Sequence, residues 1–400
     1  MPGYRGLARD REFRALFVAH VVSVAGDQFA RVALTVHVYD RTASAGLTAL
    51  TYALTFLPDL LGGPLLSGLA DRFARRGVMV AADLVRAGLL LLMALPGLPL
   101  WVLASLLVAV QLAGAPHGAA RAALLPNILP DERYPLGQAV LNTVTQAAQV
   151  AGFLGGGVLV ASFGPSPVLI ADAATFAVSA LLVGLFLLHR PAPRHPHVRA
   201  WPADLVGGAR LVWGDRRLRA LVALACVSGF YITAEALAAP LASQLGAGPA
   251  AVGAIFGVVS AGTAVGMVVL ARVPAERGLR WMPVLSVLSC AVLLPMALQP
   301  GLLWTLVLLG LSGAASGYQL LANATFVRAV PDATRGQAFG LAVTALRVSQ
   351  GLGIAAAGAA AHFWPVHHVV AAVAAAGVLA AAGASWQWTQ ACEQAEPTSP

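Results

Sequence analysis

Asp27, Asp59 and Glu235 are acidic side chains inside long apolar runs of this chain, where a carboxyl group either exchanges a proton or meets a counter-charge. Asp27 is followed one helical turn later by Arg31, so these two side chains can neutralise each other. Asp59 has no cation three or four residues away, and Glu235 lies one turn from Tyr231. Desolvation penalises the charged form of a carboxyl group, which suits a group that binds and releases a proton. We expect proton exchange at Asp59, Asp27 or Glu235, with a slight preference for Asp59. The alternatives are a structural ion pair, a buried hydrogen bond or a solvated position.

Arginines also lie within the apolar runs. Arg86 follows Asp83 by three residues near one end of its apolar run, so this pair fits a gate at the end of the run better than a binding site in its middle. Arg347 can meet an anionic small molecule or an acid such as Asp59. Uncharged polar and aromatic side chains in the same runs are candidates for lining a small-molecule cavity: Tyr52, Phe56, Asn142, Gln146, Gln149, Tyr231, Asn323 and Gln350.

The composition is that of a membrane protein. Mean hydropathy is +0.78, and 58% of residues are hydrophobic while 10% are charged, whereas soluble domains carry about 25% charged residues. The net charge of +8 does not indicate nucleic-acid binding, because all 25 cations are arginines and they cluster in short loops between apolar runs. There is no lysine and no G-x-x-x-x-G-K-[ST] motif, so the chain holds no P-loop for ATP.

Twelve apolar runs can be counted, and about 20 apolar residues span a bilayer core of about 30 Å. The runs predict an all-α membrane protein with twelve transmembrane helices. An even number places both termini on one side of the membrane. With both in the cytoplasm, Arg41 is the one arginine in an outer loop, in agreement with the positive-inside bias. The runs lie near residues 13–38, 45–70, 78–98, 100–120, 136–161, 166–188, 218–241, 249–271, 281–298, 301–322, 337–361 and 366–388.

The chain also shows signs of two halves. Its longest polar segment lies between the sixth and seventh runs and contains a short amphipathic stretch suited to a membrane surface. The segment from Asn127 aligns with the segment from Arg328 at an offset of about half the chain, which indicates a parallel repeat. We predict an N-terminal six-helix bundle (1–188), a cytoplasmic linker with a short amphipathic helix (189–217), a C-terminal six-helix bundle (218–390) and a cytoplasmic tail (391–400).

The segment SGLADRFARR, between the second and third runs, resembles the inter-helix loop motif G-x-L-A-D-R-x-G-R-R of the major facilitator superfamily. Asp71, Arg72, Arg75 and Arg76 match, while a serine and an alanine stand where the family usually has glycine. The resemblance implies the major facilitator fold, two pseudo-symmetric six-helix bundles, with these four residues as a cytoplasmic gate. Asp71 would accept hydrogen bonds from the N–H groups at the start of another helix. The alternative is a set of charges that only determines topology.

Four further segments resemble the exporter branch of this superfamily, which includes macrolide efflux proteins and the enterobactin exporter. They are residues 26–44, 82–90, 120–130 and 172–182. This resemblance implies secondary active transport by alternating access, with proton-coupled efflux of a small amphiphilic molecule such as a drug, a macrolide or a siderophore-like compound. One feature departs from the family's antiporters, because the fifth run keeps the paired glycines of their Gly-Pro-x-x-Gly-Gly pattern but lacks its proline. Paired glycines also fit simple close packing of helices.

Other functions stay open from the sequence. An importer or proton symporter of a small metabolite would carry the same motifs, and a membrane-embedded enzyme or a transport-dead sensor is a remote alternative. We expect no enzyme, because the acids, histidines and cysteines in the runs are scattered. The expected partners are a small-molecule substrate, protons and the lipid bilayer, with no cofactor, metal or nucleic acid. The expected location is the bacterial plasma (inner) membrane, as a monomer with both termini in the cytoplasm.

Overall fold

The computed structural model describes residue 7 and residues 10–55, 72–129, 133–190, 201–331 and 334–394. Within these ranges all regular structure is helical, with no strand. The chain divides into two compact units. The first unit contains Met1–Arg41, Leu54–Val198 and Gly248–Gly257, and the second contains Thr42–Ala53, Arg199–Ala247 and Val258–Pro400.

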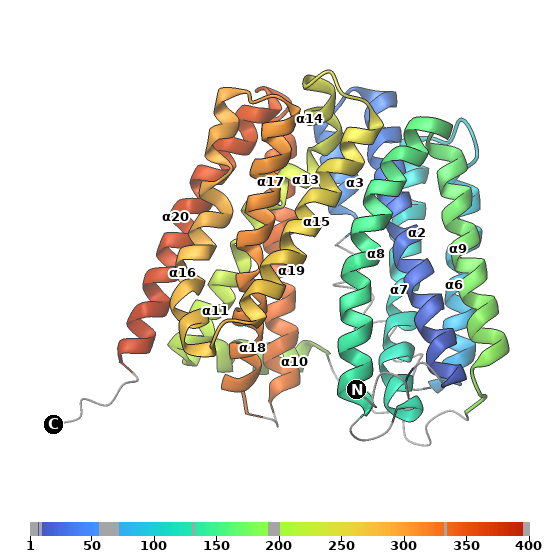
Figure 1. Cartoon of the computed structure of the whole chain (residues 1–400), viewed down its shortest axis with the longest axis horizontal. Helices are drawn as coiled ribbons and strands as arrows, with labels where there is room; N and C mark the ends of the chain where they lie inside the picture. Colours follow the sequence, from blue (N-terminus) through green and yellow to red (C-terminus); the bar gives the residue numbers. More distant parts are fainter. Residues whose placement is uncertain are drawn as a thin grey trace. The chain divides into compact units, whose positions relative to one another are not determined.

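The first unit is built mainly from five helices, α2 (Arg11–Thr42), α6 (Arg75–Met93), α7 (Leu100–Ile128), α8 (Arg133–Phe163) and α9 (Pro165–Phe186). The helix α6 packs against both α7 and α9 (Figure 1). A proline at the first helical position suits a helix start, because its missing N–H would have no partner there. This is how α9 begins, directly after Gly164, whose φ of 80° is accessible to glycine at little cost.

The second unit contains α3 (Ala45–Ala53), the short helix α10 (Trp201–Gly214) and the C-terminal helices of the chain (Figure 1). The side chain of Asp215 caps α11 by accepting hydrogen bonds from two backbone N–H groups of its first turn. The remaining elements are α11 (Arg216–Cys226), α12 (Ser228–Tyr231), α13 (Thr233–Ala236), α14 (Ala238–Gln244), α16 (Ala275–Ala291), η1 (Leu294–Leu298), α17 (Leu302–Ser316), α18 (Tyr318–Ala329), α19 (Arg335–Ala360) and α20 (Val366–Glu393); α15 (Pro249–Ala271) contributes to both units.

The all-α membrane architecture predicted from the apolar runs is confirmed. In the part of the chain that the structure describes, ten helices are long and apolar enough to cross a membrane. The helix α6 is not among them, since its 19 residues include four charged side chains. The second expected run begins as α3 and continues into residues 56–71, which lie outside the described ranges. The count of twelve and the division into two bundles with a linker therefore stay predictions.

Close helix packing holds α2 in place within the first unit. A Cβ added to Gly152 of α8 would lie 2.7 Å from the carbonyl oxygen of Ala25, so only glycine permits this approach. On the side toward α9, a Cβ added to Gly26 would overlap the Asp172 carboxyl group and the Thr175 hydroxyl group. The two contacts position the middle of α2 between α8 and α9.

Candidate functional site

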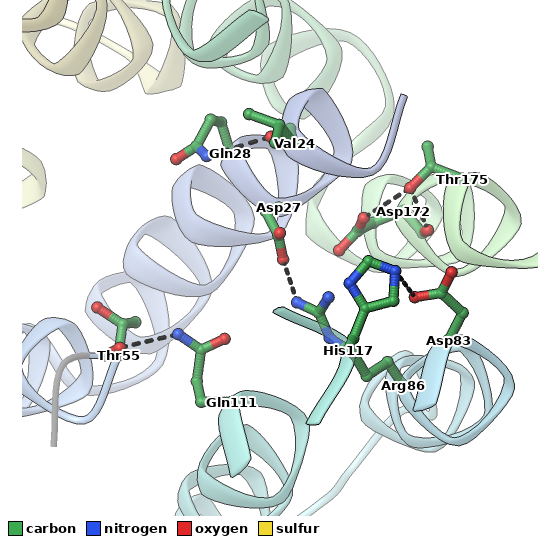
Figure 2. Close-up of polar contacts among 10 residues, drawn as sticks. All are labelled: Val24, Asp27, Gln28, Thr55, Asp83, Arg86, Gln111, His117, Asp172 and Thr175. Atoms are coloured by element: carbon green, nitrogen blue, oxygen red, sulfur yellow. Dashed lines mark hydrogen bonds and ion pairs between the residues drawn. The ribbon is translucent and has the colours of Figure 1, made fainter. Parts of the chain in front are cut away.

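Five ionisable side chains from four helices of the first unit gather in one place. Asp27 comes from α2, Asp83 and Arg86 from α6, His117 from α7 and Asp172 from α9. Figure 2 shows these side chains projecting into the same space between their helices. We call this group the buried charge cluster.

The strongest contact of the buried charge cluster joins α2 to α6. Arg86 Nη2 donates to Asp27 Oδ1 over 2.6 Å. The arginine side chain is 7% exposed and the aspartate side chain 30% exposed, so water reaches this pair from the Asp27 side. The guanidinium carbon of Arg86 also lies 3.9 Å from the centre of the Phe176 ring on α9, within the range of a cation–π interaction. One guanidinium group therefore contacts two neighbouring helices.

Asp83 makes a second set of contacts deeper in the cluster. Its side chain is fully buried, and its Oδ2 accepts a 2.6 Å hydrogen bond from the hydroxyl group of Ser179. Its Oδ1 lies 3.5 Å from Nε2 of His117, which is longer than a normal hydrogen bond. Asp83 thus has one firm donor on α9 and a titratable neighbour on α7.

Asp172, like Asp83, is buried and has one carboxyl oxygen without a hydrogen-bond partner among the described residues. The residue is 1% exposed, and its Oδ1 accepts a 3.0 Å hydrogen bond from Thr175, whose hydroxyl group also contacts the Asp172 backbone carbonyl. Its Oδ2 is buried and has no hydrogen-bond partner in the part of the chain that the structure describes. An ionised carboxylate in this environment would lack the donors needed to replace its hydration.

The charges of the cluster do not balance when all three acids are ionised. Arginine is always protonated, so Arg86 supplies one permanent positive charge against three carboxyl groups. Even a protonated His117 would leave excess negative charge in a region largely closed to water. Such an excess is costly in a low dielectric. An arrangement of this kind has the chemistry to bind and release a proton.

The structure changes the partners expected for two of these residues. Asp27 is paired with Arg86 of α6, whereas the sequence pattern suggested Arg31 on its own helix. Asp83 bonds to Ser179 while Arg86 bonds to Asp27, so these two residues take different hydrogen-bond partners, and their role in a gate stays a prediction. Helix packing, and not spacing along one helix, selects these partners.

Part of the expected gate motif can be located. Arg75 donates a 2.7 Å hydrogen bond to the carbonyl oxygen of Ala123 on α7, and Arg76 donates to the carbonyl oxygen of Gly184 on α9. These contacts bind the first turn of α6 to both of its neighbours. Arg72 is exposed. Asp71 lies outside the described residues, as do Asp59 and Phe56.

In the second unit, a residue predicted to line a cavity contacts a residue predicted to exchange a proton. The Tyr52 hydroxyl group on α3 donates a 2.7 Å hydrogen bond to Oε2 of Glu235 on α13. Tyr52 is almost fully buried and Glu235 is half-buried. The helix α3 also packs tightly on α19. A Cβ added to Gly46 of α3 would lie 3.2 Å from the carbonyl oxygen of Gly358 of α19.

The remaining cavity candidates fall into smaller groups. Gln350 is buried, donates to Ser228 over 3.2 Å and accepts from Arg347 over 3.3 Å. The hydroxyl group of Tyr231 lies 3.4 Å from a side-chain nitrogen of Gln319. Four other candidates were predicted to line a cavity: Asn142 and Asn323 are exposed, while Gln146 and Gln149 are half-buried. A cavity role for all of these residues stays a prediction.

Sequence reasoning missed two members of the buried charge cluster. Asp172 lies in the segment 172–182, which was considered only for its resemblance to exporters. No function was predicted for His117. The signal was present for both, because each is an ionisable residue within or close to an apolar run, the criterion that selected Asp59. In the described ranges no group of three or more His, Cys, Asp or Glu side chains is arranged to hold a metal ion.

Comparison with known families decides the class of the protein. Residues 16–238, more than half of the chain, match the Major Facilitator Superfamily. The chain belongs to the Major Facilitator Superfamily. All five residues of the buried charge cluster lie within the matched region. The superfamily expected from the loop motif is therefore confirmed, and this superfamily member is a multi-pass membrane protein.

Relatives of this superfamily chain include named exporters. It is 29% identical over 256 residues to the multidrug efflux pump Tap of Mycobacterium tuberculosis, an alignment that covers 59% of each chain. It is 27% identical over 126 residues to macrolide efflux protein A of Streptococcus pyogenes, covering 30% of this chain and 31% of the relative. The alignments thus span about three fifths or less of these relatives. The resemblance to the drug and macrolide exporter branch is confirmed at this level of identity.

A solved structure extends the likeness to nearly the whole chain. The nucleoside transporter NupG superposes with a TM-score of 0.74, covering 94% of this chain and 99% of NupG at 14% identity. At such low identity the superposition shows a shared superfamily fold and carries no information on substrate.

Proposed function

We propose that this protein is a secondary active exporter of a small amphiphilic molecule, such as a drug, a macrolide or a siderophore-like compound, driven by proton entry through alternating access. The names of the two relatives support efflux. The observation that carries proton coupling is the buried charge cluster, in which three carboxyl groups face one permanent cation. Its substrate, its protons and the lipid bilayer are the partners of this function.

The Asp27–Arg86 pair gives the coupling a physical basis. Protonation of the partly exposed Asp27 neutralises the carboxylate and leaves the buried Arg86 without its counter-charge. An uncompensated buried charge costs several kcal/mol, in the range of about 3–5 kcal/mol when one partner of a buried pair is removed. A state of the transporter that offers Arg86 another partner or water then becomes favoured, so proton binding shifts the conformational equilibrium.

The other acids and the loop motif have supporting parts in this proposal. Asp59 and Glu235 remain further candidates for proton exchange, and Asp71, Arg72, Arg75 and Arg76 remain the proposed cytoplasmic gate. The two contacts of Arg75 and Arg76 with α7 and α9 support this assignment, since movement of the loop would be transmitted directly to the helices that hold the cluster.

Proton flux in liposomes tests the proposed function. The purified protein is placed in liposomes with a trapped pH indicator, and ethidium or erythromycin is added as probe in the presence of a pH gradient. Exporters of this kind move protons opposite to the probe, and a protonophore abolishes probe accumulation. Proton movement in the same direction as the probe would indicate a symporter and importer. No probe-dependent proton movement with either compound would contradict proton-coupled efflux of these classes.

A further inference from the structure

Asp172 lies on α9 beside the part of α2 that carries Asp27, the present partner of Arg86. Asp172 packs against the backbone of Gly26, the residue next to Asp27, with no side chain between them. One turn after Asp172, the Phe176 ring lies under the guanidinium group of Arg86. Asp172 is also within electrostatic range of both Asp27 and Arg86. The two carboxyl groups thus lie on different helices around one cation.

Two of the unpaired polar atoms of the buried charge cluster, one on Arg86 and one on Asp172, are a complementary donor and acceptor. Arg86 uses Nη2 for Asp27, whereas its Nε is buried without a hydrogen-bond partner among the described residues. Asp172 uses Oδ1 for Thr175, whereas its Oδ2 is likewise buried and unpaired in the described part of the chain. A donor and an acceptor left open in the same cluster are costly in this arrangement, and they would satisfy each other after a rotation of the long arginine side chain.

We propose that Asp172 is the alternate partner of Arg86, so that the guanidinium group moves from Asp27 to Asp172 when Asp27 takes up a proton. This inference rests on the proposed function. In the step, an O–H bond forms on Asp27 from an entering proton, and the O–H bond of Asp172 breaks. The proton of Asp172 passes to water admitted during the alternation, and the new carboxylate bonds to Arg86. One proton enters and one leaves, the number of charges is unchanged, and no electrons are transferred.

Other titratable and charged groups lie around Asp172 and Arg86, and their charges contribute to any pH dependence of the exchange. Asp83 and Arg86 come from α6, His117 from α7 and Asp27 from α2, while Thr175 on the same helix donates to Asp172. Asp83 already has the Ser179 hydroxyl group as a donor. Among the described residues, the remaining Oδ1 of Asp83 is unpaired like Oδ2 of Asp172, but it lies 3.5 Å from Nε2 of His117, a group that can take up a positive charge, so Asp172 is the acid that depends on Arg86 for a cation.

Infrared difference spectroscopy tests the exchange without requiring transport. A protonated carboxyl group has a C=O stretch that a carboxylate lacks. In the wild type at neutral pH we expect a band from Asp172, which disappears in Asp172→Asn. The band must also disappear in Asp27→Asn, because Arg86 then pairs with an ionised Asp172. The exposed Asp40→Asn serves as the matched control and should keep the band. If the Asp172 band persists in Asp27→Asn, or if no band is lost in Asp172→Asn, the exchange is wrong.

Flux measurements separate failure of this inference from failure of the proposed function. Asp172→Asn should lower probe-coupled proton flux at least tenfold, while downhill exchange of the probe stays within about twofold of wild type. If both the wild type and Asp172→Asn show normal coupled flux, the role of Asp172 is overturned while the proposed function stands. Absence of coupled flux in the wild type would instead contradict the proposed function, and the infrared result on Asp27→Asn would still decide the exchange. That variant leaves Asp172 intact, so the test does not depend on the folding of an Asp172 substitution.

Discussion

Arg86 donates a 2.6 Å hydrogen bond to Asp27, and its guanidinium carbon lies 3.9 Å from the centre of the Phe176 ring. Through this one side chain, α6 is linked to α2 and α9 at once. Since the side chain is largely buried, both contacts act in a medium that screens charge poorly. A residue placed in this way affects both the stability of the first unit and the response of the cluster to protons.

Replacing the cation should destabilise the protein in a pH-dependent manner. Arg86→Met leaves three carboxyl groups without a permanent counter-charge, so at neutral pH we expect the free energy of unfolding to fall by about 3 kcal/mol. The loss should shrink as the pH is lowered, because protonation of the acids removes the uncompensated charge. Thermal unfolding in detergent at several pH values measures this effect. A destabilisation that does not depend on pH would argue for lost packing alone.

The bond between Ser179 and Asp83 gives a second, smaller test. Ser179→Ala removes the donor of a fully buried carboxyl group and should cost about 1–3 kcal/mol. The matched control is Ser105→Ala, because the hydroxyl group of Ser105 is exposed and bonds only to a backbone carbonyl of its own helix. Melting temperatures of the two variants should differ by several degrees. Equal melting temperatures would mean that the bond contributes little.

In the second unit, the Tyr52–Glu235 bond should be measurable as a coupling energy. Tyr52→Phe removes the donor hydroxyl group and keeps the ring, and Glu235→Met removes the acceptor oxygens and keeps the length of the side chain. We expect a coupling of about 1 kcal/mol from a double-mutant cycle on thermal unfolding. Tyr134→Phe, at an exposed tyrosine, controls for loss of a hydroxyl group. Additive effects of the two substitutions would show that the bond does not hold α3 to α13.

Much of the fold was predictable, because a bilayer requires long apolar runs and composition alone reveals them. The internal breaks were not predictable in the same way. The run 218–241 was expected as one span, and Arg216–Ala236 is one of the ten candidate membrane helices, but short turns within the region separate α11, α12, α13 and α14. Apolarity measures how favourable insertion is, and it does not report where local turns interrupt a helix. The second run stays only partly described for a different reason, since residues 56–71 lie outside the described ranges.

The sequence allowed us to predict which residues belong to the site better than which of them pair with each other. Asp27 was selected because an acid in an apolar run is costly, and the same rule applied to Asp172 would have found it. The partner of Asp27 was not accessible, because Arg86 lies 59 residues away and comes close only through the packing of α2 and α6. Spacing along one helix offers only the nearest candidates, such as Arg31. The glycine contacts that position Asp172 also depend on tertiary packing.

The loop motif leads to a prediction about the gate. Asp71→Asn should leave insertion and probe binding near wild-type levels while lowering transport at least fivefold, because it removes a charge that the family resemblance places at the cytoplasmic gate. Probe efflux from cells, normalised to protein level, measures this. Asp40→Asn is the matched control for loss of one exposed acid. Wild-type efflux by Asp71→Asn would reduce Asp71 to a residue that only sets topology.

Proton coupling through the buried charge cluster is tested most directly by probe-induced proton flux in liposomes that contain either wild-type protein, Asp27→Asn or the control Asp40→Asn. We predict coupled flux in the wild type and in Asp40→Asn, and at least a tenfold loss in Asp27→Asn, because an amide cannot take up the proton that separates Asp27 from Arg86. Downhill exchange of the probe should continue in all three proteins. Normal coupled flux in Asp27→Asn would contradict the assignment of the proton site to this cluster.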